Sequence, residues 1–244
     1  MNKSIFALAL WAVASLVQAA GGHGPALLDA NVNLGNQTSL QRGARMFVNY
    51  CLSCHSAQYM RYNRVAADLG IDEDVVEDNL MFASDKIGNT MQIAMKPADA
   101  EQWFGVAPPD LSVIARSRGA DWLYSFLNGF YLDDTRPTGV NNLYFPTTAM
   151  PHVLSELQGL QVLHEEEGED GHGSHGPELE LTSPGKLSPG QYRQATRDLV
   201  AFLVYMGEPA KLVRYKIGFW VIAFLLVLLV ATYMMKREFW KDVH

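Results

Sequence analysis

Apolar residues recur with a helical spacing in three segments of the chain. In the first segment they occupy positions i, i+4, i+7 and i+11 of one helix face: Leu40, Ala44, Phe47 and Cys51. The second predicted helix starts after Ser188–Pro189, a favourable N-cap and first-turn pair, and ends at Gly207. The third covers about residues 120–130. Because we find no alternating strand pattern, we expect a mainly α fold.

A fourth apolar segment lies near the C-terminus. Residues 217–235 contain no charged side chain. As a helix this stretch would reach roughly 28 Å, which matches the hydrocarbon core of a bilayer. Trp220 and Tyr233 lie near its two ends, where aromatic rings favour the membrane interface. We therefore predict one transmembrane helix and place the anchor at residues 211–236.

The first residues have the pattern of a secretory signal. Lys3 precedes a mostly apolar run over residues 5–17, and small residues follow at positions 17–20. We predict a signal peptide over residues 1–19, with cleavage after Ala19 or Ala20. An uncleaved membrane anchor is the alternative. In both cases the body of the chain is exported, and a bacterial periplasm is the expected compartment.

The chain is acidic, with 26 Asp and Glu residues against 19 Lys and Arg residues. The formal net charge is −7, and removal of Lys3 with the signal makes it one unit more negative. This balance argues against nucleic acid as a partner and favours a basic protein. Acidic residues concentrate in segments 68–78 and 164–180. We expect both to be solvated, the second as a mobile loop, and docking of a partner is the alternative role.

The only two cysteines stand directly before a histidine, in Cys51-Leu52-Ser53-Cys54-His55. Cys-x-x-Cys-His is the attachment motif of c-type haem: two thiols bind the porphyrin vinyl groups and the imidazole binds the iron. A redox dithiol or half of a zinc site could use the same cysteines. A dithiol gives His55 no role, and a zinc site lacks further cysteines. We predict one covalent haem c.

The first and second predicted helices also suit this cofactor. Gly43 and Phe47 on the first helix would permit a close crossing with the helix that carries Phe202 and Tyr205. Crossed N- and C-terminal helices are the hallmark of monohaem cytochrome c domains.

A haem iron that carries electrons needs a sixth ligand, and methionine favours the ferrous state. Met150 stands in Thr147-Thr148-Ala149-Met150-Pro151-His152, a predicted loop in which Pro151 stiffens the backbone. Met95 precedes a Lys-Pro pair in a similar setting, and His152 would give a bis-histidine haem. Local chemistry favours Met150 and leaves the other two open.

Several motifs in order give the chain a resemblance to a known family. They are Cys51 to His55, Tyr59 to Tyr62, Ala107 to Ser112, Ile114 to Arg116, Asp121 to Tyr124, Asn141 to Pro146, Met150 to Leu154 and Gly207 to Pro209, followed by the C-terminal anchor. In this order they resemble cytochrome c1, the haem c subunit of the ubiquinol–cytochrome c reductase (bc1) complex, of bacterial type. The resemblance covers nearly all of the chain after the predicted signal.

The resemblance implies a site and a set of partners. Met150 would be the axial ligand, Arg116 would contact a haem propionate, and Pro109 would pack along the haem edge with Pro108. The Rieske iron–sulfur subunit would reduce the haem and cytochrome c would oxidise it. Quinol chemistry would reside in cytochrome b, so this chain would not be catalytic by itself, and the complex is expected to be a dimer. The acidic loop after Leu160 lies outside the family's pattern.

Two other functions use the same motif. A free-standing membrane-anchored cytochrome c could feed a terminal oxidase, and a haem enzyme such as a peroxidase would leave the sixth position open. Our preferred division is a signal peptide (1–19), a periplasmic cytochrome c-like haem domain with long loops (20–210), a single-pass anchor in the bacterial inner membrane (211–236) and a cytoplasmic tail (237–244).

Overall fold

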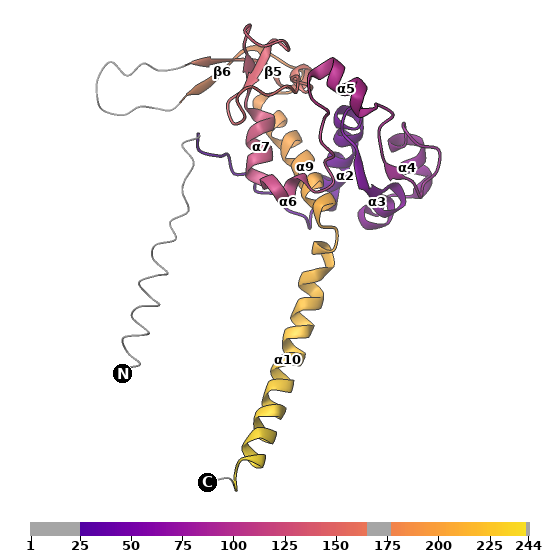
Figure 1. Cartoon of the computed structure of the whole chain (residues 1–244), viewed down its shortest axis with the longest axis vertical. Coiled ribbons are helices and arrows are strands. Elements are labelled where there is room, and N and C mark those ends of the chain that lie inside the picture. Colours follow the sequence, from indigo (N-terminus) through magenta and orange to yellow (C-terminus); the bar gives the residue numbers. More distant parts are fainter. Residues whose placement is uncertain (1–24, 165–176, 243–244) are drawn as a thin grey trace, which may run out of the picture.

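The computed structural model describes residues 25–164 and 177–242 (Figure 1). A helical domain stands at one end of a single long C-terminal helix, and a two-stranded hairpin projects from the side of that domain (Figure 1). The predicted signal peptide, with its cleavage site, and residues 165–176 of the acidic loop lie outside the described residues.

The helices of the described part are α2 (Gln37–Met46), the π-helix η1 (Phe47–Cys51), α3 (Tyr62–Leu69), α4 (Glu73–Leu80), α5 (Pro97–Phe104), α6 (Ile114–Arg118), α7 (Ala120–Asn128), α8 (Ser155–Gln158), α9 (Pro189–Gly207) and α10 (Lys211–Phe239). The strands are β1 (Ala57–Arg61), β2 (Thr90–Met91), β3 (Phe130–Leu132), β4 (Val140–Asn142), β5 (Gly159–His164) and β6 (Glu178–Pro184). They form three antiparallel two-stranded sheets.

The first predicted helix is confirmed as α2 and its continuation η1. Asn36 caps α2, because its side-chain oxygen accepts a hydrogen bond from the Ser39 amide at 3.1 Å. After Met46 the helix widens into a π-helical turn that ends at Cys51. The predicted apolar face is buried along its whole length. The helix therefore carries the start of the Cys-x-x-Cys-His motif.

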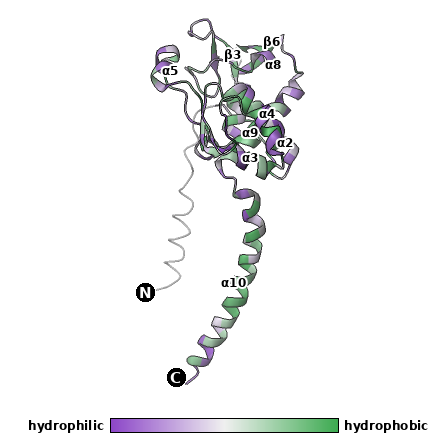
Figure 2. Ribbon diagram, turned by 90° about the vertical axis from the view of Figure 1, so that its right-hand side faces the viewer, coloured by the Kyte–Doolittle hydropathy of each residue, from purple (hydrophilic) through white to green (hydrophobic). Residues whose placement is uncertain are grey.

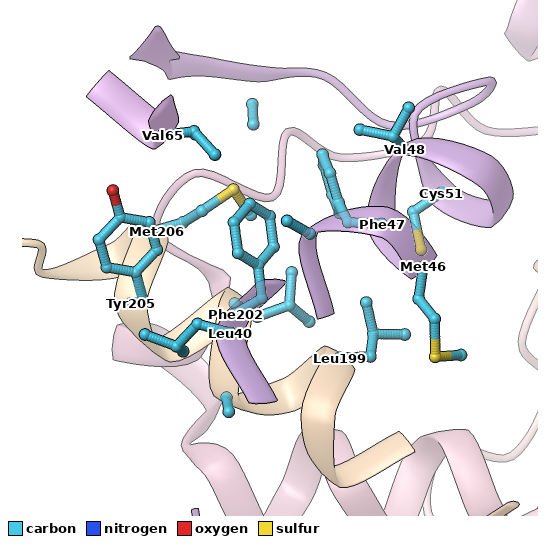
Figure 3. Packing of buried hydrophobic residues seen from close by; sticks show 14 of the residues in the cluster. Leu40, Met46, Phe47, Val48, Cys51, Val65, Leu199, Phe202, Tyr205 and Met206 are labelled. Carbon is cyan, nitrogen blue, oxygen red and sulfur yellow. The ribbon is translucent and has the colours of Figure 1, made fainter. Parts of the chain in front are cut away.

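The second predicted helix is confirmed as α9, and it crosses α2 in direct contact. Ser188 and Gln191 form a capping box at its start. At the crossing, a Cβ added to Gly43 would lie 2.1 Å from the Asp198 carbonyl oxygen and 2.7 Å from Phe202 Cβ. Beside it the Phe47 and Phe202 rings pack with centroids 5.6 Å apart (Figure 3). The predicted crossing at Gly43 is confirmed.

A buried carboxylate fastens the same crossing from the side. Asp198, 2% exposed, accepts hydrogen bonds from Arg42 Nε at 2.6 Å and from Ser39 Oγ at 2.5 Å. Gln194 adds a third donor at 3.0 Å. A buried carboxylate is tolerated only when it is paired and hydrogen-bonded, and here both helices supply donors.

Two sequence predictions differ from the structure. The third helix, α7, ends at Asn128, and Phe130 belongs to strand β3, which pairs with β4 in the register Phe130↔Asn142. The predicted mainly α fold is confirmed, but it also contains short strands that the sequence pattern did not indicate, because β3 and β4 have only three residues each and are too short for an alternating pattern. The longer pair β5–β6 projects from the domain, and most of its positions are at least partly exposed, so no buried face marks it.

The described residues of the two acidic segments are more structured than expected. Segment 68–78 comprises the end of α3 and most of α4, in which Val76 is fully buried. Asp68 is not simply solvated, because it accepts hydrogen bonds from Arg64 at 2.5 Å and from Tyr205 at 2.9 Å. In segment 164–180, His164 and Glu180 belong to paired strands and contact each other at 2.7 Å.

The C-terminal apolar segment forms one long helix, α10. Its stretch Val213–Phe239 is long and apolar enough to cross a membrane, and none of its most apolar window is buried against the rest of the chain. Most of the helix is hydrophobic, with hydrophilic residues toward both ends (Figure 2). Apolar side chains so exposed need a lipid or protein partner, and a bilayer is the natural one for this length.

The crossing makes a prediction about stability. Gly43→Ala should lower the free energy of unfolding by about 1–3 kcal/mol, because the new methyl group meets backbone atoms of α9 that cannot move independently. The measurement is guanidinium unfolding of the haem-loaded protein. Gly190→Ala is the matched control, since a Cβ there meets nothing within 4 Å. Equal stability of the two variants would contradict the close contact.

Candidate functional site

A cavity of about 460 Å³ lies between the Cys-x-x-Cys-His motif, the segment around Pro109, helices α6, α7 and α9, and the loop that carries Met150. Its walls are largely apolar, with Leu199 and Leu203 of α9 on one of them. An apolar pocket with a few polar groups at fixed positions is the usual form of a cofactor site. Five of the six site residues predicted from the sequence line it: Cys51, Cys54, His55, Pro109 and Met150.

The motif closes one tight turn at the end of η1. The amides of Cys54 and His55 both donate to the Cys51 carbonyl oxygen, at 3.1 and 2.8 Å. Both cysteines are free thiols and both line the cavity. The turn therefore presents two thiols and one imidazole to the same space, as attachment and ligation of one haem require.

The ring of His55 is held by the backbone of the Pro109 segment. Its Nδ1 lies 2.7 Å from the Pro109 carbonyl oxygen. A carbonyl only accepts, so Nδ1 carries the proton and Nε2 keeps a free lone pair for a metal. Burial lowers the pKa of His55, and the Pro109 hydrogen bond opposes this shift only in part. The imidazole is thus kept neutral, the form that binds iron.

Side-chain hydrogen bonds in turn hold the Pro109 segment against the motif. Asp110 accepts from the Gln58 amide at 2.9 Å and from the Ser112 amide at 2.8 Å. The Leu111 amide donates to the Ser56 carbonyl oxygen at 2.8 Å. The acceptor of the His55 proton is therefore tied to the chain that directly follows His55, which limits rotation of the ring.

The structure separates the three candidates for the sixth ligand. Met150 lines the cavity together with Thr148, Ala149 and Pro151. Met95 is not among the lining residues. His152 is buried outside the lining, where its ring stacks on Phe130 at 4.8 Å, and burial lowers its pKa to about 4. Of the three, only Met150 shares the cavity with His55.

The arginine at the cavity is not the predicted one. Arg116 is exposed on α6 and does not line the cavity; its Cγ lies 3.2 Å from where a Cβ on Gly207 would be. Arg118, two residues further along the same helix, does line the cavity. Its guanidinium lies 4.8 Å from the centre of the Trp122 ring. The placement therefore does not support the propionate contact expected of Arg116. Both arginines stand on one short helix, so only the direction of each side chain could distinguish them.

The other uses of the two cysteines are not favoured. A redox dithiol needs a thiol of lowered pKa, but burial, with a smaller contribution from Cys54, raises the pKa of Cys51 to about 12. A zinc site needs further ligands. In residues 25–164 and 177–242, no three His, Cys, Asp or Glu side chains are grouped so as to hold a metal.

Crossed terminal helices, a Cys-x-x-Cys-His turn and a methionine on the same apolar cavity define a cytochrome c-type haem domain. Within this class, the chain belongs to the cytochrome c1 family, whose sequence profile matches residues 31–170 and 187–243. Membership implies haem c as the cofactor. The residues present fit it, because the cavity offers two thiols, a neutral imidazole and a thioether in largely apolar walls.

Two of the relatives, both named cytochrome c1, agree with this assignment. The chain is 49% identical to cytochrome c1 of Allochromatium vinosum, over all of both chains. It is 45% identical to a protein of Nitrosomonas europaea named ammonia monooxygenase gamma subunit, again over all of both. Cytochrome c1 of Blastochloris viridis is 28% identical, with 85% of this chain and 82% of that one covered. A chain of a hyperthermophilic respiratory complex III aligns over 99% of this chain and 98% of its own, with 17% identity and a TM-score of 0.45.

The site geometry predicts how the haem is attached. Acid–acetone extraction should leave the pigment on the polypeptide, because both thiols line the same cavity and neither forms a disulfide. Replacing Cys51 and Cys54 together with serine should make the pigment extractable. Ser53→Ala, which changes the exposed residue between them, should keep it bound. Removal of haem from the unsubstituted chain would refute covalent attachment.

Proposed function

We propose that the chain is the membrane-anchored electron-transfer subunit of a bacterial quinol–cytochrome c reductase of the bc1 type. One observation carries this proposal: the fold brings His55 and Met150 to a single cavity beside both cysteines, in a chain of the cytochrome c1 family. Two protein ligands on the iron suit electron transfer, because no coordination position stays open for a substrate.

Each site residue has a distinct role in this proposal. The thiols of Cys51 and Cys54 would add across the two vinyl groups of one haem; each addition would break one S–H bond and one vinyl π bond and form one C–S and one C–H bond, so no oxidant is needed. His55 would offer Nε2 to the iron while its Nδ1–H donates to the Pro109 carbonyl oxygen, and Met150 would offer its sulfur. Haem c, when bound, supplies one-electron chemistry between Fe(II) and Fe(III). Arg118 is the cation at the cavity and suits a propionate better than Arg116.

The partners follow from the family. The Rieske iron–sulfur subunit would deliver electrons, a cytochrome c would accept them, and cytochrome b would carry the quinol chemistry in a dimeric complex. Export would place the haem domain in the periplasm, α10 in the inner membrane and the residues after it in the cytoplasm. A formal charge of −7 supports a basic acceptor, because opposite charge raises association rates.

The ligand assignment can be tested by substitution. Met150→Leu should lower the reduction potential by on the order of 100 mV or more, and abolish the Met–Fe(III) band at about 695 nm, because the thioether that favours Fe(II) is lost. Met95→Leu is the matched control and should change neither property. If Met95→Leu abolished the band and Met150→Leu did not, the ligand would be Met95. An absent band in the unsubstituted protein would favour an open or bis-histidine site.

The assignment to a complex can be tested by purification. A tag at the C-terminus should bring down a cytochrome b and a Rieske protein from detergent-solubilised membranes, and an inhibitor of the quinol-oxidation site should block quinol-driven reduction of the haem. A chain that purifies without cytochrome b, and passes electrons directly to a terminal oxidase, would establish the free-standing cytochrome instead.

A further inference from the structure

The backbone just before Met150 has an unusual conformation. Thr147 has φ 66°, one of two positive values outside glycine in the described residues. A β-branched residue is strained in this left-handed region, so neighbouring groups must hold it there. The four residues that follow Thr147, from Thr148 to Pro151, all line the cavity, and Met150 is the third of them. The strained turn therefore sets the direction in which the chain enters the cavity wall.

Two side chains from the β3–β4 hairpin hold this turn by its backbone. Asn141 Oδ1 accepts a hydrogen bond from the Thr147 amide at 2.8 Å. Arg136 Nη2 donates to the Thr147 carbonyl oxygen at 2.9 Å. Both polar groups of the strained residue are thus engaged by one hairpin. We name these two contacts the Thr147 clamp.

The hairpin itself is built so that the clamp is rigid. Asn141 is 8% exposed. Its side-chain Nδ2 donates to Asp133 Oδ2 at 2.9 Å, and its Oδ1 also accepts from the backbone amide of Asn142 at 2.9 Å. With these partners the Asn141 side chain has one available orientation. The neighbouring Asn142 accepts from the Tyr144 and Phe145 amides, at 3.0 and 3.2 Å, and so anchors the start of the same loop.

We propose that Asn141 and Arg136 are positioning residues that keep Met150 on the haem iron by holding Thr147 in its strained conformation. This inference rests on the function proposed above, in which Met150 is the sixth ligand. Neither side chain is among the residues that line the cavity, so both act through the backbone. Without the clamp, relief of the strain at Thr147 would draw the loop away from the iron.

The physical reason is a competition between two loop states. In the closed state of the loop Met150 is bound to the ferric iron, and in the open state it is not. An added ligand such as imidazole binds the iron only in the open state, so the apparent affinity for imidazole increases with the population of that state. Loss of the part-buried hydrogen bond from the Thr147 amide to Asn141 costs enough to change such a population about tenfold. Loss of the clamp should therefore be visible as easier displacement of the methionine, with little change in the rest of the domain.

The experiment is an imidazole titration of the oxidised, haem-loaded full-length protein in detergent, followed at the Met–Fe(III) band. In Asn141→Ala the imidazole concentration at half-displacement should decrease about tenfold. Arg136→Gln, which leaves the hydrogen bond between the Thr147 amide and Asn141 in place, should give a smaller decrease of a few-fold. Asn79→Ala removes an identical side chain from the exposed face of α4 and should change nothing. Guanidinium unfolding, measured in parallel, separates loop opening from general loss of stability.

The outcomes are distinct. If the unsubstituted protein shows the band but Asn141→Ala and Arg136→Gln titrate like it, the Thr147 clamp is refuted and the proposed function stands. If the unsubstituted protein has no Met–Fe(III) band, Met150 is not the ligand, and the proposed role of the Thr147 clamp is refuted as well. If Asn141→Ala does not load haem, Arg136→Gln decides alone: a decrease supports the clamp, and an unchanged titration overturns it.

Discussion

The contact of α2 with α9 at Gly43 is the constraint on which the rest of the domain depends. No side chain fits between Gly43 and the Asp198 carbonyl, so the two helices have one separation and one crossing point. Four positions after Phe47, which packs on Phe202, η1 delivers Cys51 to the cavity that α9 lines with Leu199 and Leu203. Attachment site and cavity wall are thereby fixed relative to each other before any loop is placed.

The two residues proposed as axial ligands are held by different means. His55 follows directly from the helix and needs only one external contact, the Pro109 carbonyl, to set its tautomer and its ring direction. Met150 stands in a loop whose strained turn at Thr147 is held by side chains of a short hairpin. Methionine has a flexible side chain and its thioether is a weak ligand, so the position of its sulfur depends on the backbone that holds it. The position of the His55 nitrogen is instead set by the hydrogen bond of its rigid ring.

Polar and charged groups have different roles at the helix crossing, at the cavity and on the surface. The buried carboxylate of Asp198 is matched by donors from both crossing helices and serves the fold. The cavity has largely apolar walls, and Arg118 lies among its lining residues with its guanidinium over an aromatic ring. Most of the remaining charge is exposed, where it costs little and can attract a partner over a distance. Apolar surface is exposed in quantity on α10, the helix that is long and apolar enough to cross a membrane.

Several features were predictable from the sequence because their signals are local. The helical period of Leu40 to Cys51, the cap at Ser188, the uncharged segment 217–235 and the Cys-x-x-Cys-His spacing each lie within a few turns of chain. Only the tertiary structure decided three other features. They are the short hairpins, the placement of Arg118 rather than Arg116 at the cavity, and the hydrogen bond between Asn141 and the Thr147 amide. Three-residue strands carry no period, and the direction of a side chain on a five-residue helix depends on what packs against it. Hydrogen bonds from a hairpin to a later loop exist only once the chain has folded.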